Sequence, residues 1–378
     1  MDVTLPKKDL IRLFGRTQGV ADKKSTMPIL SNALVMARGG SIRASATDLF
    51  MAVTSSQPAT IQRDGLIALP AKELVERLKA MPEGLVQFSV SEGSTVLLKA
   101  VGAKREFRLR GMPGEDFPTL PQPDESSTEL AISPAILADL IAKTSFSISP
   151  DETRPHLNSA LLEWDGAVAR MVTTDGHRLS KYEIDVPGVE AKFSLLIPLK
   201  GIGELRRLCD ELRSDKSTDA PIKLLRGGPN VFFSYARPGE ESLLAIKLVD
   251  AQFPPYQQVI PQRSDHSARV SRASFIDALR AMSIAASERT GSVKISLAGG
   301  TMRVSSENPD SGDALDELAV EYAGPDMTIG FNVRYLLDVL TVIDAEDVKL
   351  GLSGELDPVV VSPASDARFL GIVMPMRI

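Results

Sequence analysis

The sequence carries three copies of one pattern, and this repetition limits what the chain can fold into. The copies begin with LSNALV at residues 30–35, LNSALL at 157–162 and, more divergent, VKISL at 293–297. After a turn containing glycine, they end with SATD at residues 45–48, VTTD at 172–175 and VSSEN at 304–308. The copies lie about 125–135 residues apart, which is the length of one domain. The sequence therefore predicts three tandem domains of similar fold.

Each copy is accompanied by two segments with apolar residues at helical spacing and by many short strands. The predicted helices cover residues 7–16, 71–81, 134–143, 199–213, 272–282 and 332–343. The predicted fold class is α+β, with two helices packed on antiparallel sheets in each domain. Polar linkers at residues 123–128 and 263–267 separate the domains. We place the domains at residues 1–124, 128–262 and 268–378.

Composition and leader signals indicate the compartment. No run of about 18 apolar residues predicts a membrane span. The first residues lack the basic and apolar regions of a signal peptide. Cys209 is the only cysteine, so it has no partner within the chain, and we expect it to be a buried packing residue. These features predict a cytoplasmic protein.

Positive charge is concentrated on the predicted helices. The chain has a net charge of −6, which by itself argues weakly against a nucleic-acid partner. The six helical segments, however, carry 15 basic and 9 acidic residues, whereas the rest of the chain carries 28 basic and 40 acidic residues. Lysine and arginine also favour helices without any ligand. The imbalance is thus compatible with a surface for a polyanion or with ordinary helix composition.

Residues 173–179, TTDGHRL, form the only tight motif that contains a histidine. An aspartate next to a histidine is typical of acid–base catalysis or of half a metal site. Thr47-Asp48 takes the same place in the first copy without a histidine, which favours a turn held by the Asp side chain. Phosphate-binding loops, zinc motifs and serine-nucleophile motifs are absent. We therefore expect a binding or structural role, no catalysis, and no cofactor or metal ion.

Six segments of the chain stand out together: TMPILSN at 26–32, ATDL at 46–49, TTDGHRL at 173–179, KLVD at 247–250, GFNVRYLLDVL at 330–340 and VMPMR at 373–377. In this order they resemble the bacterial DNA polymerase III sliding clamp (β subunit), a family of processivity factors in DNA replication. The resemblance covers essentially the whole chain. It implies a head-to-tail homodimer in which six clamp domains close a ring around double-stranded DNA, with helices lining the hole. Such a ring is retained by topology rather than by affinity.

The resemblance also implies which residues bind peptides, face DNA and form the dimer contact. A cleft between the second and third domains would receive short linear motifs from DNA polymerase III, other polymerases and the clamp loader. Its residues would be Arg154, Leu157, Thr174, Gly176, His177, Arg178, Leu179, Pro254, Val259, Asn332, Tyr335, Met374, Pro375, Met376 and Arg377. The residues facing DNA would be Lys24, Arg12, Lys79, Arg206 and Arg280. The dimer contact would pair Phe107 and Leu109 with Ile284.

Two other interpretations are open to the sequence. The first is an enzyme that uses Asp175, His177 and Arg178, for which His177→Ala would abolish turnover. The second is a scaffold that binds peptides but not DNA, which would tolerate charge reversal at Lys24, Arg12 and Arg206. In a clamp, His177→Ala would weaken only peptide binding, whereas charge reversal at Lys24, Arg12 and Arg206 would impair loading onto DNA.

Overall fold

The computed structural model describes residues 1–22, 25–124, 128–187, 191–214, 220–286, 291–308 and 312–377. They form two compact units. The first unit is Met1–Ala135 with Gly203–Leu248, and the second is Ile136–Ile202 with Val249–Ile378. The middle third of the chain is therefore shared between the units. In the described ranges, no helix is both long and apolar enough to cross a membrane.

One order of elements occurs three times along the chain: a strand, a helix, four strands, a second helix and three strands. The first repeat adds two short strands to this plan, β5 and β10. The six helices of the described ranges are α1 (Lys7–Val20), α2 (Ala71–Ala80), α3 (Pro134–Thr144), α4 (Leu199–Ser214), α5 (Arg272–Ala285) and α6 (Val333–Thr341). The predicted fold class is confirmed. Helix α1 extends one turn beyond its predicted end because Val20 is buried.

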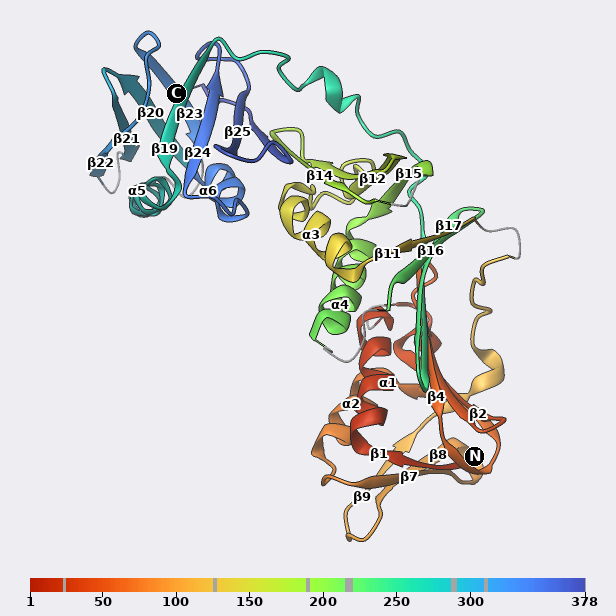
Figure 1. Cartoon of the computed structure of the whole chain (residues 1–378). Coiled ribbons are helices and arrows are strands. Elements are labelled where there is room, and N and C mark those ends of the chain that lie inside the picture. The colour runs from red at the N-terminus through yellow and green to blue at the C-terminus, as the bar shows by residue number, and fades with distance from the viewer. Residues whose placement is uncertain are drawn as a thin grey trace. The chain divides into compact units, whose positions relative to one another are not determined.

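Two sheets form the first unit (Figure 1). The five-stranded sheet contains, in spatial order, β5 (Thr60–Arg63), β1 (Asp2–Pro6), β7 (Leu85–Val90), β8 (Thr95–Ala100) and β9 (Glu106–Arg110). The nine-stranded sheet contains β10 (Met112–Pro113), β6 (Gly65–Pro70), β2 (Asn32–Arg38), β3 (Ser41–Thr47), β4 (Met51–Pro58), β18 (Glu240–Lys247), β17 (Asn230–Arg237), β16 (Ile222–Gly227) and β11 (Thr128–Ile132).

Two further sheets form the second unit. The eight-stranded sheet contains, in spatial order, β15 (Ala191–Pro198), β12 (Ser159–Gly166), β13 (Val168–Thr174), β14 (Arg178–Asp185), β26 (Phe369–Val373), β25 (Val359–Pro363), β24 (Asp347–Leu352) and β19 (His266–Ser271). The four-stranded sheet contains β22 (Gly312–Ala319), β21 (Thr301–Asn308), β20 (Ser292–Ala298) and β23 (Met327–Asn332). Strand β19 begins inside the predicted linker at 263–267, because His266 and Ser267 pair with β24.

Strands of successive repeats join into one sheet at two places. Strand β4 of the first repeat pairs with β18 of the second, from Met51 opposite Ile246 to Ser56 opposite Glu241. Strand β14 of the second repeat pairs in the same way with β26 of the third. Main-chain hydrogen bonds therefore continue from one repeat into the next.

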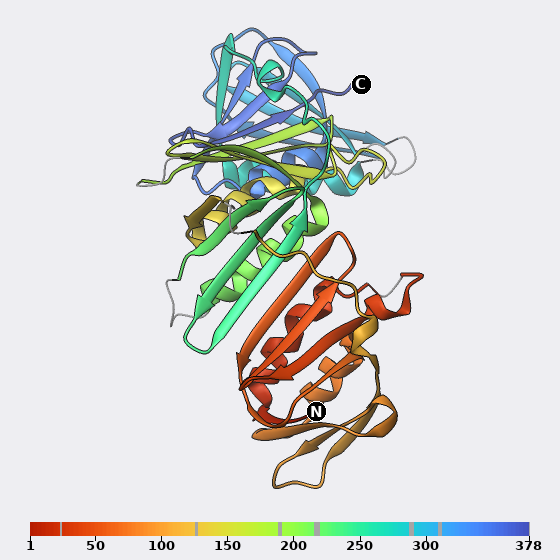
Figure 2. The same cartoon turned by 90° about the vertical axis from the view of Figure 1, so that its right-hand side faces the viewer.

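Apolar residues alternate along the strands and face the helices. In β2 and β3, Ala33, Val35, Ile42 and Ala44 are fully buried on the side where α1 contacts the sheet. The ring of Phe14 on α1 stacks on Phe88, with centroids 6.2 Å apart. Figure 2 shows the helices behind the nine-stranded sheet, whose other face is turned to the viewer. One face of the sheet is thus covered by helices, and the other is free of them.

Polar residues start several helices at the expected points. The hydroxyl of Ser133 accepts the backbone N–H of Ala135 at the start of α3, and Ser271 accepts that of Ser274 at the start of α5. The side chain of Asn332 accepts the N–H of Arg334 at 2.9 Å and caps α6. Cys209 on α4 is fully buried, as expected, and burial raises the pKa of its thiol to about 12.

Candidate nucleic-acid and peptide interfaces

A shallow hollow with two cations lies on the helical face of the first unit. Its volume is about 520 Å³, and Lys79 of α2 and Arg207 of α4 lie at its rim. Gly15 and Gly19 of α1 form part of its floor. A side chain at Gly15 would touch nothing within 4 Å, so the helix backbone is accessible there. Phosphate groups are typical ligands of such a surface of exposed cations. Arg207 was not among the predicted DNA-facing residues.

The predicted DNA-facing residues differ in how free their charges are. Lys79 and Arg280 are exposed. Arg206 is also exposed and lies 3.8 Å from Asp210, one helical turn away. Arg12 instead donates to Glu240 at 3.2 Å, so part of its charge is neutralised within the protein. Lys24 lies outside the described residues.

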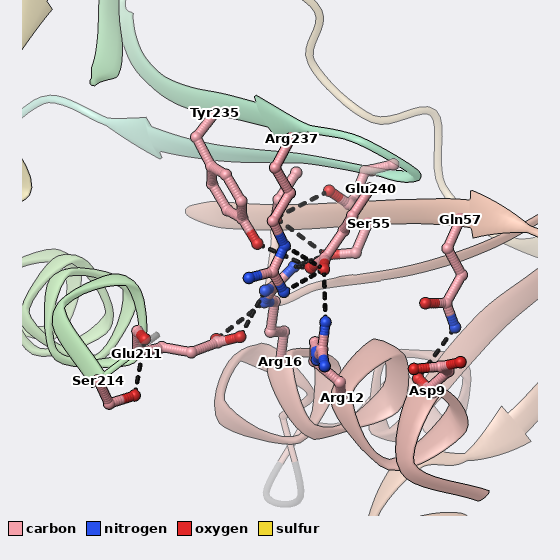
Figure 3. A network of polar contacts seen from close by, with 12 residues as sticks. Asp9, Arg12, Arg16, Ser55, Gln57, Glu211, Ser214, Tyr235, Arg237 and Glu240 are labelled. Carbon is pink, nitrogen blue, oxygen red and sulfur yellow. Dashed lines mark hydrogen bonds and ion pairs between the residues drawn. The ribbon is translucent and has the colours of Figure 1, made fainter. Parts of the chain in front are cut away.

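A buried polar network holds α1 against α4 and the β17–β18 hairpin (Figure 3). Arg16 of α1 is 8% exposed and forms ion pairs with Glu211 of α4 and with Glu240 of β18. Tyr235 donates to Glu240 at 2.7 Å, and Arg237 donates to the same carboxylate at 2.7 Å. Glu240 is 6% exposed and forms ion pairs with three arginines, which are Arg12, Arg16 and Arg237. This network links α1 to α4, the helix that carries Arg206 and Arg207.

We predict that Glu240→Gln lowers the free energy of unfolding by about 3–5 kcal/mol, because buried arginines lose their counter-charge. Urea unfolding followed by circular dichroism measures the change. Glu241→Gln is the matched control, since that carboxylate is exposed on the same strand, and a change below about 0.5 kcal/mol is expected. Equal effects of the two substitutions would contradict the role of the network.

The same network predicts an acid-sensitive step in stability. Burial alone would raise the pKa of Glu240, but Arg16, Tyr235 and Arg237 outweigh it and lower the pKa from 4.5 to about 2. A carboxylate whose pKa is lower in the folded than in the unfolded protein stabilises the fold at any pH above its unfolded pKa. This contribution is lost as the pH falls towards the folded pKa. Wild-type stability should therefore decline from about pH 5 towards pH 2, and Glu240→Gln should show a shallower decline.

The TTDGHRL segment of the second unit forms the expected Asp-held turn. Asp175 accepts the backbone N–H groups of His177 and Arg178 at 2.9 and 3.0 Å, and its second oxygen accepts Nε of Arg178. Asp48 accepts two backbone N–H groups in the same way in the first repeat. The carboxylate of Asp175 is occupied by structural contacts, so its geometry does not fit a general base.

Arg178 and His177 both contact helix α6. The guanidinium of Arg178 lies 4.5 Å from the ring centroid of Tyr335 and donates to Asp338 at 2.6 Å. The His177 ring stacks on Tyr335 with centroids 6.3 Å apart. Burial raises the pKa of the Tyr335 hydroxyl. The carbonyl of His177 also accepts the N–H of Met374 at 2.9 Å. The structure thus brings together residues predicted from three distant segments.

The remaining cleft residues surround this group. Leu179 is buried in an apolar cluster with Tyr256 and Ile372, against which Phe253 and Ile260 pack. Leu157 is buried, Val259 is 42% exposed, and Met376 donates its N–H to Gly330. Thr174 accepts the N–H of Gly176, which has a φ of 93°, and Arg154 lies near this turn. Partly or fully exposed residues complete the set: Pro254, Met374, Pro375 and Arg377.

The residues predicted for a dimer contact belong to both units, Phe107 and Leu109 to the first and Ile284 to the second. Phe107 and Leu109 belong to β9, the last strand of the five-stranded sheet. Leu109 is buried and Phe107 is half-buried. Ile284 of α5 is 86% exposed, which is exceptional for an isoleucine.

Three family models match the chain in sequence. The N-terminal, central and C-terminal domains of the DNA polymerase III beta subunit match residues 1–121, 131–255 and 257–377. The chain is 32% identical to the beta sliding clamp of Pseudomonas aeruginosa over 381 residues and 29% identical to that of Escherichia coli over 380 residues. Both comparisons cover 100% of each chain.

Solved structures give the same result. A crystal structure of the DNA polymerase sliding clamp from Pseudomonas aeruginosa matches with a TM-score of 0.91 at 31% identity. The DNA polymerase III beta subunit of Thermotoga maritima matches with a TM-score of 0.91 at 28% identity. The first match covers 100% of both chains, and the second covers 100% of this chain and 99% of the other. The chain belongs to the DNA polymerase III beta subunit family, the non-catalytic sliding clamps of bacterial DNA replication.

Proposed function

We propose that two copies of this chain close head to tail into a ring around duplex DNA and tether DNA polymerase III to its template. The observation that carries the proposal is the pattern of paired and unpaired strands. Strand β18 pairs with β4, and the equivalent strand of the third repeat, β26, pairs with β14. The first repeat's equivalent strand, β9, and the third repeat's equivalent of β4, β22, both end their sheets.

If a second copy of the chain supplies the partner strand, these two free edges form the same pairing that joins successive repeats within the chain. The other sheet ends in the described ranges are β5 and β10, which are additions to the first repeat, and β11, β15, β19 and β23, whose first-repeat equivalents β1 and β6 are covered only by these two additions. Among these edges, only β9 and β22 have equivalents that pair with a strand of another repeat. Pairing β22 of one copy with β9 of the next repeats the contact already made twice within the chain. A heterologous contact of this kind gives a ring when it closes.

The charges on the two edges are opposite. Strand β9 exposes Arg108 and Arg110, and Arg108 forms an ion pair with Glu106, an exposed acidic residue of the same strand. Strand β22 exposes Asp313 and Glu317. Antiparallel pairs with opposite charges on one face are stabilised, whereas like charges directly opposite are destabilised. Charge complementarity therefore supports the proposed contact, which would also cover the half-buried Phe107.

DNA in such a ring is held by the closed protein and not by tight contacts. Lys79, Arg206, Arg207 and Arg280 would contact phosphates, which carry no sequence information. Lys24 and Arg12 complete the proposed set, although Arg12 is already paired with Glu240. Weak, uniform phosphate contacts allow the ring to slide along the duplex.

The cluster around Leu179, His177 and Tyr335 is the proposed docking site for linear motifs of polymerases and of a clamp loader. Apolar side chains and flexible methionines suit a site that accepts many sequences. A crystal structure of the Caulobacter crescentus beta sliding clamp is described with a polymer bound to a beta-motif tethering region. We place the domains of this chain at residues 1–124, 128–262 and 268–378, so the site lies between the second and third domains.

Light scattering tests the assembly directly. The proposal predicts a particle of twice 40.7 kDa at micromolar concentration, whereas a mass of one chain would contradict the ring.

Neutralising the cations tests the DNA-facing surface. We predict that Lys79→Ala with Arg206→Ala, Arg207→Ala and Arg280→Ala weakens binding to primed DNA. The slope of log K against log salt should fall by about 0.9 for each phosphate that the variant no longer neutralises. Lys99→Ala, on an exposed strand position of β8, is the control for charge alone. An unchanged slope in the quadruple variant would place the DNA elsewhere.

A further inference from the structure

Each repeat places an arginine four residues after a turn glycine with left-handed backbone. The glycines are Gly39, Gly166 and Gly299, with φ angles of 61°, 63° and 53°. The arginines are Arg43 on β3, Arg170 on β13 and Arg303 on β21. Their positions in the strand ladders are equivalent, because each arginine lies opposite one residue of the preceding strand and one of the following strand.

In two of the repeats this arginine is paired with carboxylates. Arg170 donates to Glu183 at 2.6 Å and to Glu163 at 3.4 Å, the residues directly opposite it on both neighbouring strands. The hydroxyl of Tyr256 donates to Glu163 at 2.7 Å and completes the group. Arg303 lies 3.8 Å from Glu317, which is directly opposite.

The first repeat keeps the arginine and lacks its partners. Met36 and Ser56 stand opposite Arg43, where the second repeat has Glu163 and Glu183. Leu120 takes the place of Tyr256 in the matching FPTLPQ and FPPYQQ segments. The side chain of Arg43 is exposed and has no ion pair with any residue in the described ranges.

A hollow lies beside Arg43 and is lined by Met36, Ser56 and Leu120. It has a volume of about 450 Å³, and its lining includes residues of β4 and of the neighbouring strand β18. Figure 2 shows the sheet that these strands share. Its lining combines Arg43 with the apolar side chains of Leu34, Leu120 and Leu243 and with the hydroxyls of Ser45 and Thr54. This volume is in the range of ligand-binding pockets. We call it the Arg43 hollow.

We propose that the Arg43 hollow binds a short acidic peptide segment, whose carboxylate pairs with Arg43 and whose adjacent aromatic side chain packs on the leucines. The second repeat shows the complement that the hollow lacks, since two glutamates and a tyrosine fill the equivalent place there. Pairing of a guanidinium with a carboxylate is strong when both donor and acceptor are charged. The site lies within the first unit and uses none of the residues assigned to the peptide cleft.

The surrounding charges favour a single carboxylate over a polyanion. Glu241 also lines the hollow, opposite Ser56 on the side away from Arg43. Lys223, the other cation of the lining, is already paired with Glu129 at 2.9 Å. A nucleic-acid backbone would therefore meet one free cation and one carboxylate, so phosphate recognition is disfavoured.

Ligand-detected NMR titration of the full-length protein tests the proposal with two blocked tetrapeptides. The probes are acetyl-Leu-Glu-Tyr-Ala-amide and its counterpart with Gln in place of Glu. We expect the Glu peptide to bind at least about tenfold more tightly, because only its carboxylate can replace the missing partner of Arg43. Equal affinities, or no binding of the Glu peptide at all, would overturn the proposal.

Two variants locate the binding on the protein. Arg43→Gln should remove the preference for the Glu peptide, and Met36→Glu with Ser56→Glu should reduce binding at least about tenfold by giving Arg43 internal carboxylates. Arg38→Gln, an exposed arginine on β2, should bind like the wild type. All three variants should keep the wild-type mass in light scattering and the wild-type retention on DNA. A failure of the peptide-binding proposal is therefore distinguishable from a failure of the proposed ring. Wild-type peptide binding in Arg43→Gln, or weakened duplex DNA binding instead, would contradict the site.

Discussion

Reversing Arg108 and Arg110 to glutamate is expected to turn the assembled protein into single chains of 40.7 kDa that no longer stay on circular DNA. The substitution places glutamates on β9 opposite the acidic edge of β22, where the proposed contact requires opposite charges. Both contacts of a two-chain ring use the same pair of edges, so each copy is affected at both. Light scattering and retention on circular DNA measure the two effects.

Charge exchange separates electrostatic repulsion from misfolding. Asp313→Arg with Glu317→Arg should break the ring by the same argument, and combining it with Arg108→Glu and Arg110→Glu should restore the dimer. Lys192→Glu with Lys349→Glu reverses two exposed charges on β15 and β24, away from these edges, and should leave the mass unchanged. If the fourfold exchange remains a single chain while its unfolding curve is normal, β9 and β22 do not meet.

Replacing Met374 and Met376 with alanine is expected to weaken binding of a polymerase-derived motif peptide by about 100-fold, because each truncated anchor of an interface core costs about 1–2 kcal/mol. Their backbone N–H groups, which bond to His177 and Gly330, are unaffected by the change. Fluorescence anisotropy of a labelled peptide measures the affinity. Processivity should fall with it.

The controls for this second prediction make it independent of the first. Leu356→Ala removes an apolar side chain that is 66% exposed elsewhere in the second unit, and it should not change peptide affinity. The double methionine variant should remain a dimer and stay on circular DNA. Wild-type peptide affinity in that variant would move the docking site away from the chain's last described residues.

Local features of the fold could be predicted from the sequence. Apolar spacing located the six helices of the described ranges, since residues such as Leu10, Leu13 and Phe14 mark one buried face. The repeated TD motif predicted the turn in which Asp48 and Asp175 accept backbone amides. These features depend on neighbours within a few residues, so a short window of sequence contains the physical cause.

Residue patterns alone did not predict features that depend on distant segments, and the contacts of His177 with Tyr335 and Met374 were expected only from the family resemblance. The pairing of β4 with β18, and the ion pair of Arg16 with Glu240, join residues from different repeats that lie far apart in the sequence. The same is true of Arg207, whose place beside Lys79 follows from how α4 packs. Arg43 is different, because aligning the three repeats on their turn glycines would have shown an arginine whose acidic partners are missing only in the first copy.

Topological retention is the central claim, and its most direct test compares closed and cut DNA. The protein is loaded onto a nicked circular duplex, and the amount bound is followed by gel filtration before and after a restriction enzyme linearises the circle. We predict long-lived association with the circle and loss within the time of cutting, because the ring slides off free ends. Equal loss from circles and linear DNA would contradict it.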